Sequence, residues 1–309
     1  MMIYADHAAT TALSKRALAA VLPFLQGKYG NASSVYAFGK RARQAIERAR
    51  RQVADAVGAA ASEIVFTAGG SEGNNMVLRG AADRAWRAGR RAHIVVSTIE
   101  HPSVLAPCRA LERLGARIDY VPVSQGGRVA AESVAAALSE ETCLVSVMLA
   151  NNEVGTVQDI ATIAELLKER GVPFHTDAVQ AVGHIPVDVK ALGVTYLTAS
   201  GHKFGGMKGT GFLWQREGAE LPPLISGGGQ ERGHRAGTEN TAGVVALGEA
   251  LTESVERMQE DAGRLRGLVA YTLQMIQREV PEVRVHGAGK EHLPGLLNIG
   301  IPGVRGDSL

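Results

Sequence analysis

Cysteine is scarce in this sequence, which contains only Cys108 and Cys143 among its 309 residues. Two isolated cysteines exclude a disulfide framework and a thiolate metal site, and they fit a reducing compartment. Each cysteine is therefore expected to pack in the core as a small apolar side chain.

Long apolar runs and a strong net charge are also missing. No apolar run approaches the ~18 residues of a membrane span, and the start, MMIYADHAATT, lacks the basic and apolar regions of a signal peptide. The net charge of +2 predicts no general attraction to nucleic acid or to acidic membranes. The Arg-rich segment 40–52 carries alanines and Ile46 at helical spacing, which favours a solvated helix face. We therefore expect a cytoplasmic globular protein.

Short apolar, β-rich runs alternate with helical patterns from residue 60 to about 215. This alternation predicts a mostly parallel sheet covered by helices on both faces. The segment 209–215 adds one more strand, with an antiparallel direction as an open alternative. The expected strands are 63–68, 93–98, 116–123, 142–150, 172–178 and 194–199, and the expected helices between them are 72–88, 102–114, 131–139 and 159–170.

The pattern changes after residue 240, where apolar residues from Leu247 to Ile276 follow three- and four-residue steps. This spacing predicts a helix of about 35 residues, or about 50 Å, which is long enough to link two domains. Two short strand candidates follow, at 283–287 and 295–301. The remaining chain is too short for an independent core, so the second domain is expected to be incomplete.

Unusual polar residues follow the predicted strands, at the sheet edge where open α/β sheets bind ligands. GGSEGNN (69–75) opens a helix and suits either a phosphate or a tight turn with a helix cap. His101 follows the strand 93–98 and has a structural alternative, and Asn152 follows the strand 142–150, where it could offer an amide to a ligand. His175 and Asp177 share a strand face and suggest a metal pair, but no third ligand has suitable spacing.

Lys203 follows the strand 194–199 within SGHKFGGMKGTG (200–211). It is either a solvated loop lysine or a reactive amine beside backbone that a cofactor approaches closely. Pyridoxal 5'-phosphate (PLP) would use all of these strand-end residues. Its aldehyde needs a lysine amine, its ring nitrogen needs a carboxylate, and its phosphate needs hydroxyl and N–H donors.

Six motifs in order carry a resemblance to a known family: FTAGGSEGNN, EHPSV, ANNEVGT, FHTDAVQAVG, SGHKFGGMKG and GGGQERGHRAGTEN. Together they resemble the cysteine desulfurases, a branch of the class V aminotransferases among the fold-type I PLP enzymes. His7 departs from the pattern, because the family usually has Asn in D-N-A-A-T-T. The resemblance implies an α/β fold with a mostly parallel seven-stranded sheet, a large PLP-binding domain over 15–257, and a smaller, incomplete α+β domain from 1–14 and 258–309.

The resemblance also implies a role for each site residue. Lys203 would hold the cofactor as a Schiff base and move protons at the substrate, and His101 would stack on the ring and act as an acid–base group. Asp177 would hold the ring nitrogen protonated, and Gln180 would bind the phenolic oxygen. The phosphate ligands would be Gly70, Ser71, Ser200 and His202. Asn152 would lie near the phenolic oxygen and the substrate carboxylate, while Thr238 would reach the phosphate of a neighbouring subunit in a homodimer.

The family's nucleophile is a cysteine on a mobile loop, which takes sulfur from L-cysteine as a persulfide and releases L-alanine. Neither Cys108 nor Cys143 occupies that place, so we expect a C-terminally truncated desulfurase that is inactive in sulfur transfer. The full activity would supply sulfur to an acceptor protein or an iron–sulfur scaffold. Two alternatives stay open: another class V enzyme, such as a selenocysteine lyase or an aminotransferase, and a non-catalytic PLP-binding scaffold.

Overall fold

A seven-stranded sheet forms the centre of the computed structural model, which describes residues 3–287, 289 and 291–306. The strand order is β1-β7-β6-β5-β4-β2-β3. Neighbouring strands pair in parallel except on both sides of β7, which is antiparallel to β1 and to β6. The predicted α/β fold with a mostly parallel seven-stranded sheet is therefore confirmed, including the antiparallel last strand. The strands are β1 (Ile64–Thr67), β2 (His93–Ser97), β3 (Arg117–Val121), β4 (Thr142–Ser146), β5 (Phe174–Asp177), β6 (Tyr196–Ser200) and β7 (Gly211–Gln215).

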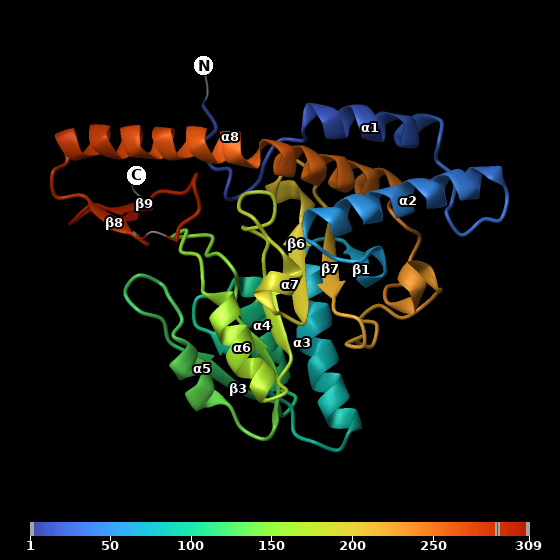
Figure 1. Cartoon of the computed structure of the whole chain (residues 1–309), viewed down its shortest axis with the longest axis horizontal. Coiled ribbons are helices and arrows are strands. Elements are labelled where there is room, and N and C mark those ends of the chain that lie inside the picture. The colour runs from blue at the N-terminus through green and yellow to red at the C-terminus, as the bar shows by residue number, and fades with distance from the viewer. Residues whose placement is uncertain (1–2, 288, 290, 307–309) are drawn as a thin grey trace.

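Helices cover both faces of this sheet (Figure 1). One hydrophobic core joins α2, α6 and α8 to one face, and a second joins α3 and α4 to the other. Successive residues of a strand enter different cores: Val95 packs in the first, whereas Ile94 and Val96 pack in the second. Burial on both faces explains why the strands are continuously apolar in the sequence. The helices are α1 (Lys15–Gln26), α2 (Ala37–Ala56), α3 (Gly70–Arg87), α4 (Pro102–Glu112), α5 (Ala131–Ala137), α6 (Ile160–Glu169), α7 (Val189–Leu192) and α8 (Thr241–Glu279).

The long helix α8 spans 39 residues, slightly more than its apolar spacing predicts. Its first half packs against α1 and α2, and its second half extends over the hairpin formed by β8 (Arg284–His286) and β9 (Asn298–Gly300) (Figure 1). Both short strands were predicted. The segment around His292 pairs with Thr156 across an isolated bridge, so this last part of the chain contacts the loop after β4.

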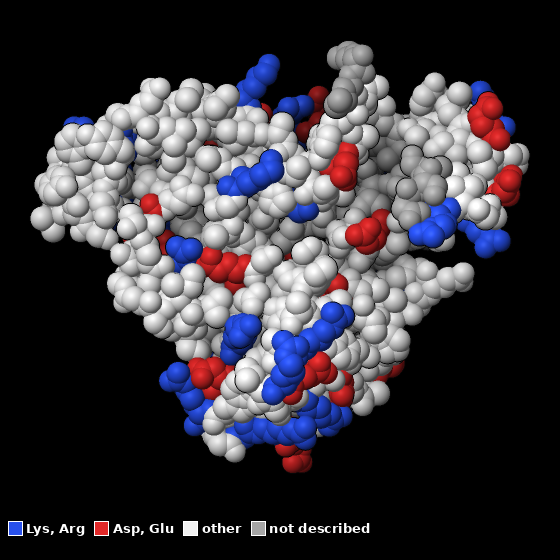
Figure 2. Space-filling view, turned by 180° about the vertical axis from the view of Figure 1, so that it is seen from behind, with Lys and Arg blue, Asp and Glu red and all other residues white. Residues whose placement is uncertain are grey.

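Charged side chains of both signs gather at the lower end of the face in Figure 2, while few lie at its upper left. The helix α1 exposes the apolar residues Leu18, Leu22 and Leu25, and the segment after it exposes Tyr29 and Tyr36. Within the described residues, every helix is too short or too polar to cross a membrane.

Candidate functional site

The first part of the candidate site is a glycine turn between β1 and α3. Gly69 precedes the helix with φ +147°, and none of the described side chains caps the first turn of α3. The first N–H groups of this 18-residue helix are therefore free to bind an anion, with the helix dipole in support. Gly211 allows the neighbouring strand to approach, because a Cβ there would lie 2.5 Å from the Ala199 carbonyl oxygen. An anion-binding turn thus forms beside the end of β6.

This turn opens into a cavity of about 500 Å³. The cavity is lined by four residues that the sequence predicted as phosphate ligands: Gly70, Ser71, Ser200 and His202. His202 shares a hydrogen bond of 3.0 Å with the hydroxyl of Thr10, and burial, followed by the charges of Lys203 and Lys208, lowers its pKa. A phosphate here would meet hydroxyl groups, an imidazole and free backbone N–H groups.

Lys203 lies in the short 3₁₀ helix Gly201–Lys203 directly after β6. Its half-buried ammonium group donates hydrogen bonds to the carbonyl oxygens of Ala8, at 2.5 Å, and Ala9, at 2.9 Å. Burial lowers the pKa of Lys203, while the charges of Asp177 and Asp6 oppose this effect. The ring of His184 holds the Lys203 carbonyl at 2.9 Å. Lys203 is therefore an amine on a fixed backbone, and burial favours its neutral, nucleophilic form.

Asp177 ends β5 and is only 4% exposed. One carboxylate oxygen accepts the backbone N–H of Val179 at 2.9 Å, and the other accepts the side-chain amide of Asn74 at 2.7 Å. Burial raises the pKa of Asp177, against these two hydrogen bonds and the charges of His101 and Lys203. A buried carboxylate held by two donors suits a cationic ring nitrogen, which would supply the missing positive partner.

The N-terminal segment 6–11 lies over this region and holds several of its groups. Gln180 donates to the Ala8 carbonyl at 2.9 Å, and Thr11 binds the His202 carbonyl at 2.9 Å and the Gly205 N–H at 2.8 Å. His7 is exposed and makes an edge contact with Tyr4, at 5.3 Å between ring centroids. The motif DHAATT thus connects the start of the chain to Lys203 and Gln180.

His101 precedes α4 and caps it, because its Nδ1 accepts the Ser103 N–H at 3.1 Å. Asn152 lies on the loop after β4, where its amide donates to Glu153 at 2.6 Å. Hydrogen bonds through Asn74 and Ser103 connect Asp177 to His101, so these two residues lie in one region. Asn152 has no contact with the other candidate residues among the hydrogen bonds of the described chain.

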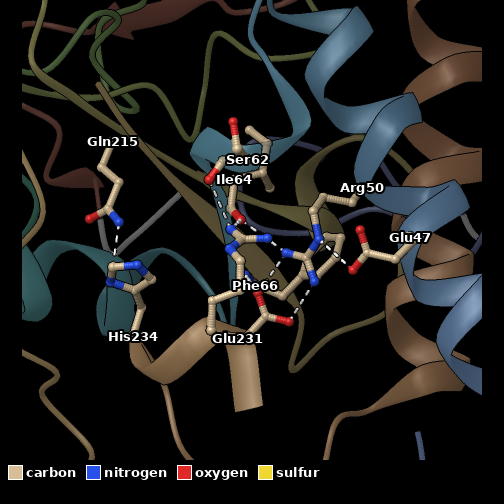
Figure 3. A network of polar contacts seen from close by, with 9 residues as sticks. Glu47, Arg50, Ser62, Ile64, Phe66, Gln215, Glu231 and His234 are labelled. Atoms are coloured by element: carbon tan, nitrogen blue, oxygen red, sulfur yellow. Dashed lines mark hydrogen bonds and ion pairs between the residues drawn. The ribbon is translucent and has the colours of Figure 1, made fainter. Parts of the chain in front are cut away.

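Thr238 lies on the segment between β7 and α8, and its side chain is exposed. Two ion pairs hold this segment. Arg50 binds Glu231 through both terminal nitrogens, at 2.7 and 2.8 Å, and the pair is almost fully buried (Figure 3). Arg235 binds Glu72 in the first turn of α3, at 2.8 Å. The segment carrying Thr238 is thereby tied to the anion-binding helix and to α2.

Glu231 and Arg232 adopt left-handed backbone conformations, with φ of 47° and 57°. Residues other than glycine rarely adopt this backbone conformation unless other contacts compensate for its strain. Here Glu231 also accepts the Phe66 N–H at 2.8 Å (Figure 3). Arg232 donates to the carbonyl oxygens of Ser62 and Ile64. These hydrogen bonds therefore offset the backbone strain and fix the course of this segment.

The metal alternative for His175 finds no support in the described residues, which contain no group of three His, Cys, Asp or Glu side chains able to hold a metal ion. His175 is fully buried between the hydroxyls of Ser146 and Thr198, at 2.8 and 3.0 Å. Burial lowers its pKa to about 3, so the ring is neutral. His175 is a core histidine with both nitrogens occupied.

Both cysteines lie in the core, as predicted. Cys108 on α4 is 0% exposed and Cys143 on β4 is 9% exposed. Burial raises the pKa of Cys108 to about 12 and also raises that of Cys143. Neither thiol is a nucleophile near neutral pH, since the thiolate is the reactive form.

Two buried polar residues near Asp177, Asn74 and Glu100, were not predicted from the sequence. Asn74 on α3 is 0% exposed and binds both Asp177 and Ser103. Glu100 accepts the Ser97 hydroxyl at 2.5 Å and the Met148 N–H at 2.8 Å, and burial raises its pKa to about 8. The sequence could have indicated Asn74 only as a polar residue at a position of α3 that faces the core.

These residues fit PLP. Uncapped helix N–H groups and hydroxyls face one cavity, a buried carboxylate lies at the end of β5, and a lysine with a lowered pKa follows β6. These three groups are of the kinds that a phosphate, a ring nitrogen and an aldehyde each need as a partner.

Comparisons with known proteins identify the family of this chain. A family model described as aminotransferase class V matches residues 3–309. The chain is 44% identical to a cysteine desulfurase IscS of Dictyoglomus turgidum and 43% identical to a cysteine desulfurase of Mus musculus, covering 99% of this chain and 77% and 67% of those proteins. Among solved structures, a NifS-like protein has a TM-score of 0.95 at 36% identity, covering 100% of this chain and 84% of that one. The structure of SspA in complex with cysteine has a TM-score of 0.88 at 35% identity, covering 97% of this chain and 84% of that one.

Proposed function

Because the chain belongs to the class V aminotransferase family, in its cysteine desulfurase branch, we propose that it binds PLP and takes L-cysteine as its substrate. The observation that carries this proposal is that Asp177 ends β5 and Lys203 follows the paired strand β6, whose last residue, Ser200, lines the cavity at the start of α3. When bound, PLP supplies an aldehyde for a lysine amine and a ring that withdraws electrons from the substrate α-carbon.

Ser71, Ser200 and His202 bind the phosphate together with the N–H groups at the start of α3. This contact anchors the cofactor, because a phosphate gains both hydrogen bonds and the helix dipole there. Gln180 lies within the same region and donates to the phenolic oxygen. His101 covers the ring, and Asn152 takes the substrate side of the site.

Asp177 holds a proton on the ring nitrogen. The ion pair would compensate the cost of burying its carboxylate, which its raised pKa reflects. Lys203 would act as the general base that moves the proton at the substrate α-carbon. Burial lowers its pKa, which favours the neutral amine that this proton transfer needs.

Sulfur transfer needs a thiolate that reaches the substrate sulfur, and neither cysteine of the 309 residues provides one. Cys108 and Cys143 are buried, and their pKa values are raised. The thiol that accepts the sulfur is therefore neither Cys108 nor Cys143. The chain spans about three quarters of the length of the relatives it matches.

The active unit is a homodimer, in the cytoplasm, that passes sulfur to an acceptor or iron–sulfur scaffold protein. Exposed apolar side chains on α1 and on the segment after it support self-association. Monomeric proteins rarely expose large apolar patches, and such patches often mark protein–protein interfaces. The exposed position of Thr238, on a segment held by two ion pairs, supports its contact with the neighbouring subunit.

Exchange of the α-carbon proton of L-cysteine in D₂O tests this function without requiring an acceptor thiol. The PLP-loaded protein should exchange that proton, and Lys203→Ala should abolish the exchange while Cys108→Ser and Cys143→Ser leave it intact. Formation of a keto acid in addition to proton exchange would identify an aminotransferase. Absence of any exchange, with PLP bound, would favour the scaffold alternative.

A further inference from the structure

A continuous chain of hydrogen bonds connects Asp177 to His101 through two residues without an assigned role. Asn74 Nδ2 lies 2.7 Å from Asp177 Oδ2 and 2.8 Å from the Ser103 hydroxyl. The Ser103 hydroxyl lies 2.7 Å from His101 Nδ1. The four residues come from β5, α3 and the start of α4, so three separate elements meet in this chain.

The direction of each hydrogen bond follows from the chemistry of its ends. Both oxygens of Asp177 accept hydrogen bonds, so the Asn74 atom that faces Asp177 is the NH₂ group. This group has two hydrogens, and the second points to the Ser103 oxygen. The Ser103 hydroxyl then has its own hydrogen free for His101 Nδ1, which also accepts the Ser103 backbone N–H. In a neutral ring, a doubly accepting Nδ1 places the proton on Nε2.

A buried asparagine that only joined α3 to α4 would satisfy its own polar atoms. Asn74 does not, because its Oδ1 is buried without a hydrogen-bond partner among the described residues. An unsatisfied buried acceptor destabilises a fold, and an apolar side chain of the same size would avoid that cost. The orientation of the Asn74 side chain is thus set by the two acceptors of its NH₂ group, Asp177 and Ser103. Asp177 is itself a proposed contact of the cofactor ring, and Ser103 holds the other one, His101.

We propose that Asn74 and Ser103 are positioning residues that couple the Asp177 carboxylate to the tautomer of His101. Asn74 fixes the orientation of the carboxylate that faces the cofactor nitrogen. Ser103 holds His101 with its Nε2–H directed away from the chain of hydrogen bonds. The proposal rests on the proposed function only where Asp177 and His101 are taken to contact PLP; the hydrogen-bond chain itself is a property of the protein without cofactor.

The first experiment tests whether Asn74 acts through Asp177. The PLP dissociation constant is measured for the wild type, Asn74→Leu, Asp177→Asn and the double variant. Asn74→Leu should weaken PLP binding about tenfold in the wild type, as expected for a lost hydrogen bond to a charged group, and have no further effect in the Asp177→Asn background. The same factor in both backgrounds would refute the coupling and show a structural role alone.

The second experiment examines His101 in the protein without PLP, so it remains informative if the protein does not bind this cofactor. The ¹⁵N signals of the labelled histidine rings distinguish protonated from unprotonated nitrogens. His101 should have an unprotonated Nδ1 in the wild type and in Ser103→Thr, which retains the hydroxyl. In Ser103→Ala the two ring nitrogens should move toward averaged signals. A protonated Nδ1 in the wild type, or identical signals in Ser103→Ala, would overturn the proposal.

Discussion

Replacing Glu231 by Gln should destabilise the fold by about 3 kcal/mol, because it leaves a buried Arg50 without its counter-charge. The two side chains are only 3% and 4% exposed, and they share two hydrogen bonds, at 2.7 and 2.8 Å. The amide retains an oxygen for the Phe66 N–H, so the lost charge is the main change. Arg50 keeps Glu47 at 3.0 Å, a half-exposed partner, which favours the lower end of the usual 3–5 kcal/mol.

The assay is thermal and denaturant unfolding of the complete chain. With an unfolding entropy of ~2 cal/mol/K per residue over 309 residues, a loss of about 3 kcal/mol lowers Tm by about 5 °C. Exposed Glu279→Gln is the matched control, and its effect should remain within about 0.5 kcal/mol. The double variant Arg50→Met with Glu231→Gln should recover most of the loss, since no charge remains buried. A single-variant loss below ~1 kcal/mol, or purely additive effects, would refute the reasoning.

Two further predictions concern carboxyl groups near the site. Asp177→Asn should slow α-proton exchange of L-cysteine about 10- to 1,000-fold while PLP remains bound, because the ring nitrogen loses the charge that keeps it protonated; an unchanged rate would remove Asp177 from this role. Burial raises the pKa of Glu100 from 4.5 to about 8, so the folded state keeps a proton that the unfolded chain releases. The stability that this retained proton contributes to the fold is fully present below pH 4.5 and is lost as pH rises toward 8. The free energies of unfolding of the wild type and of Glu100→Gln should therefore diverge between these pH values. Parallel dependence of both free energies on pH would contradict a buried, protonated Glu100.

Most of the sheet could be predicted because strands buried on both faces are continuously apolar and regularly spaced with helices. The helix α1 could not be predicted in this way. It buries only Ala17 and Val21, contains Pro23 and exposes several leucines, so its apolar pattern does not mark one inner face. Its course depends on packing against α8, which local sequence does not specify.

The site was predictable where its residues follow strand ends, because parallel strands bring those ends to one edge. Ser71, Ser200 and His202 indeed line one cavity. Asn74 and Glu100 escaped prediction, since their meaning depends on distances between separate elements. A buried amide beside a carboxylate becomes recognisable only when α3 is placed against β5.

The most direct test of the account is to reduce the PLP-loaded protein with borohydride and map the modified peptide by mass spectrometry. We expect one PLP per chain, fixed to the side chain of Lys203. This half-buried amine has a lowered pKa and directly follows His202, which lines the proposed phosphate cavity. Lys203→Ala should yield no fixed cofactor. Modification of another lysine, or the absence of any adduct in the wild type, would contradict the central claim.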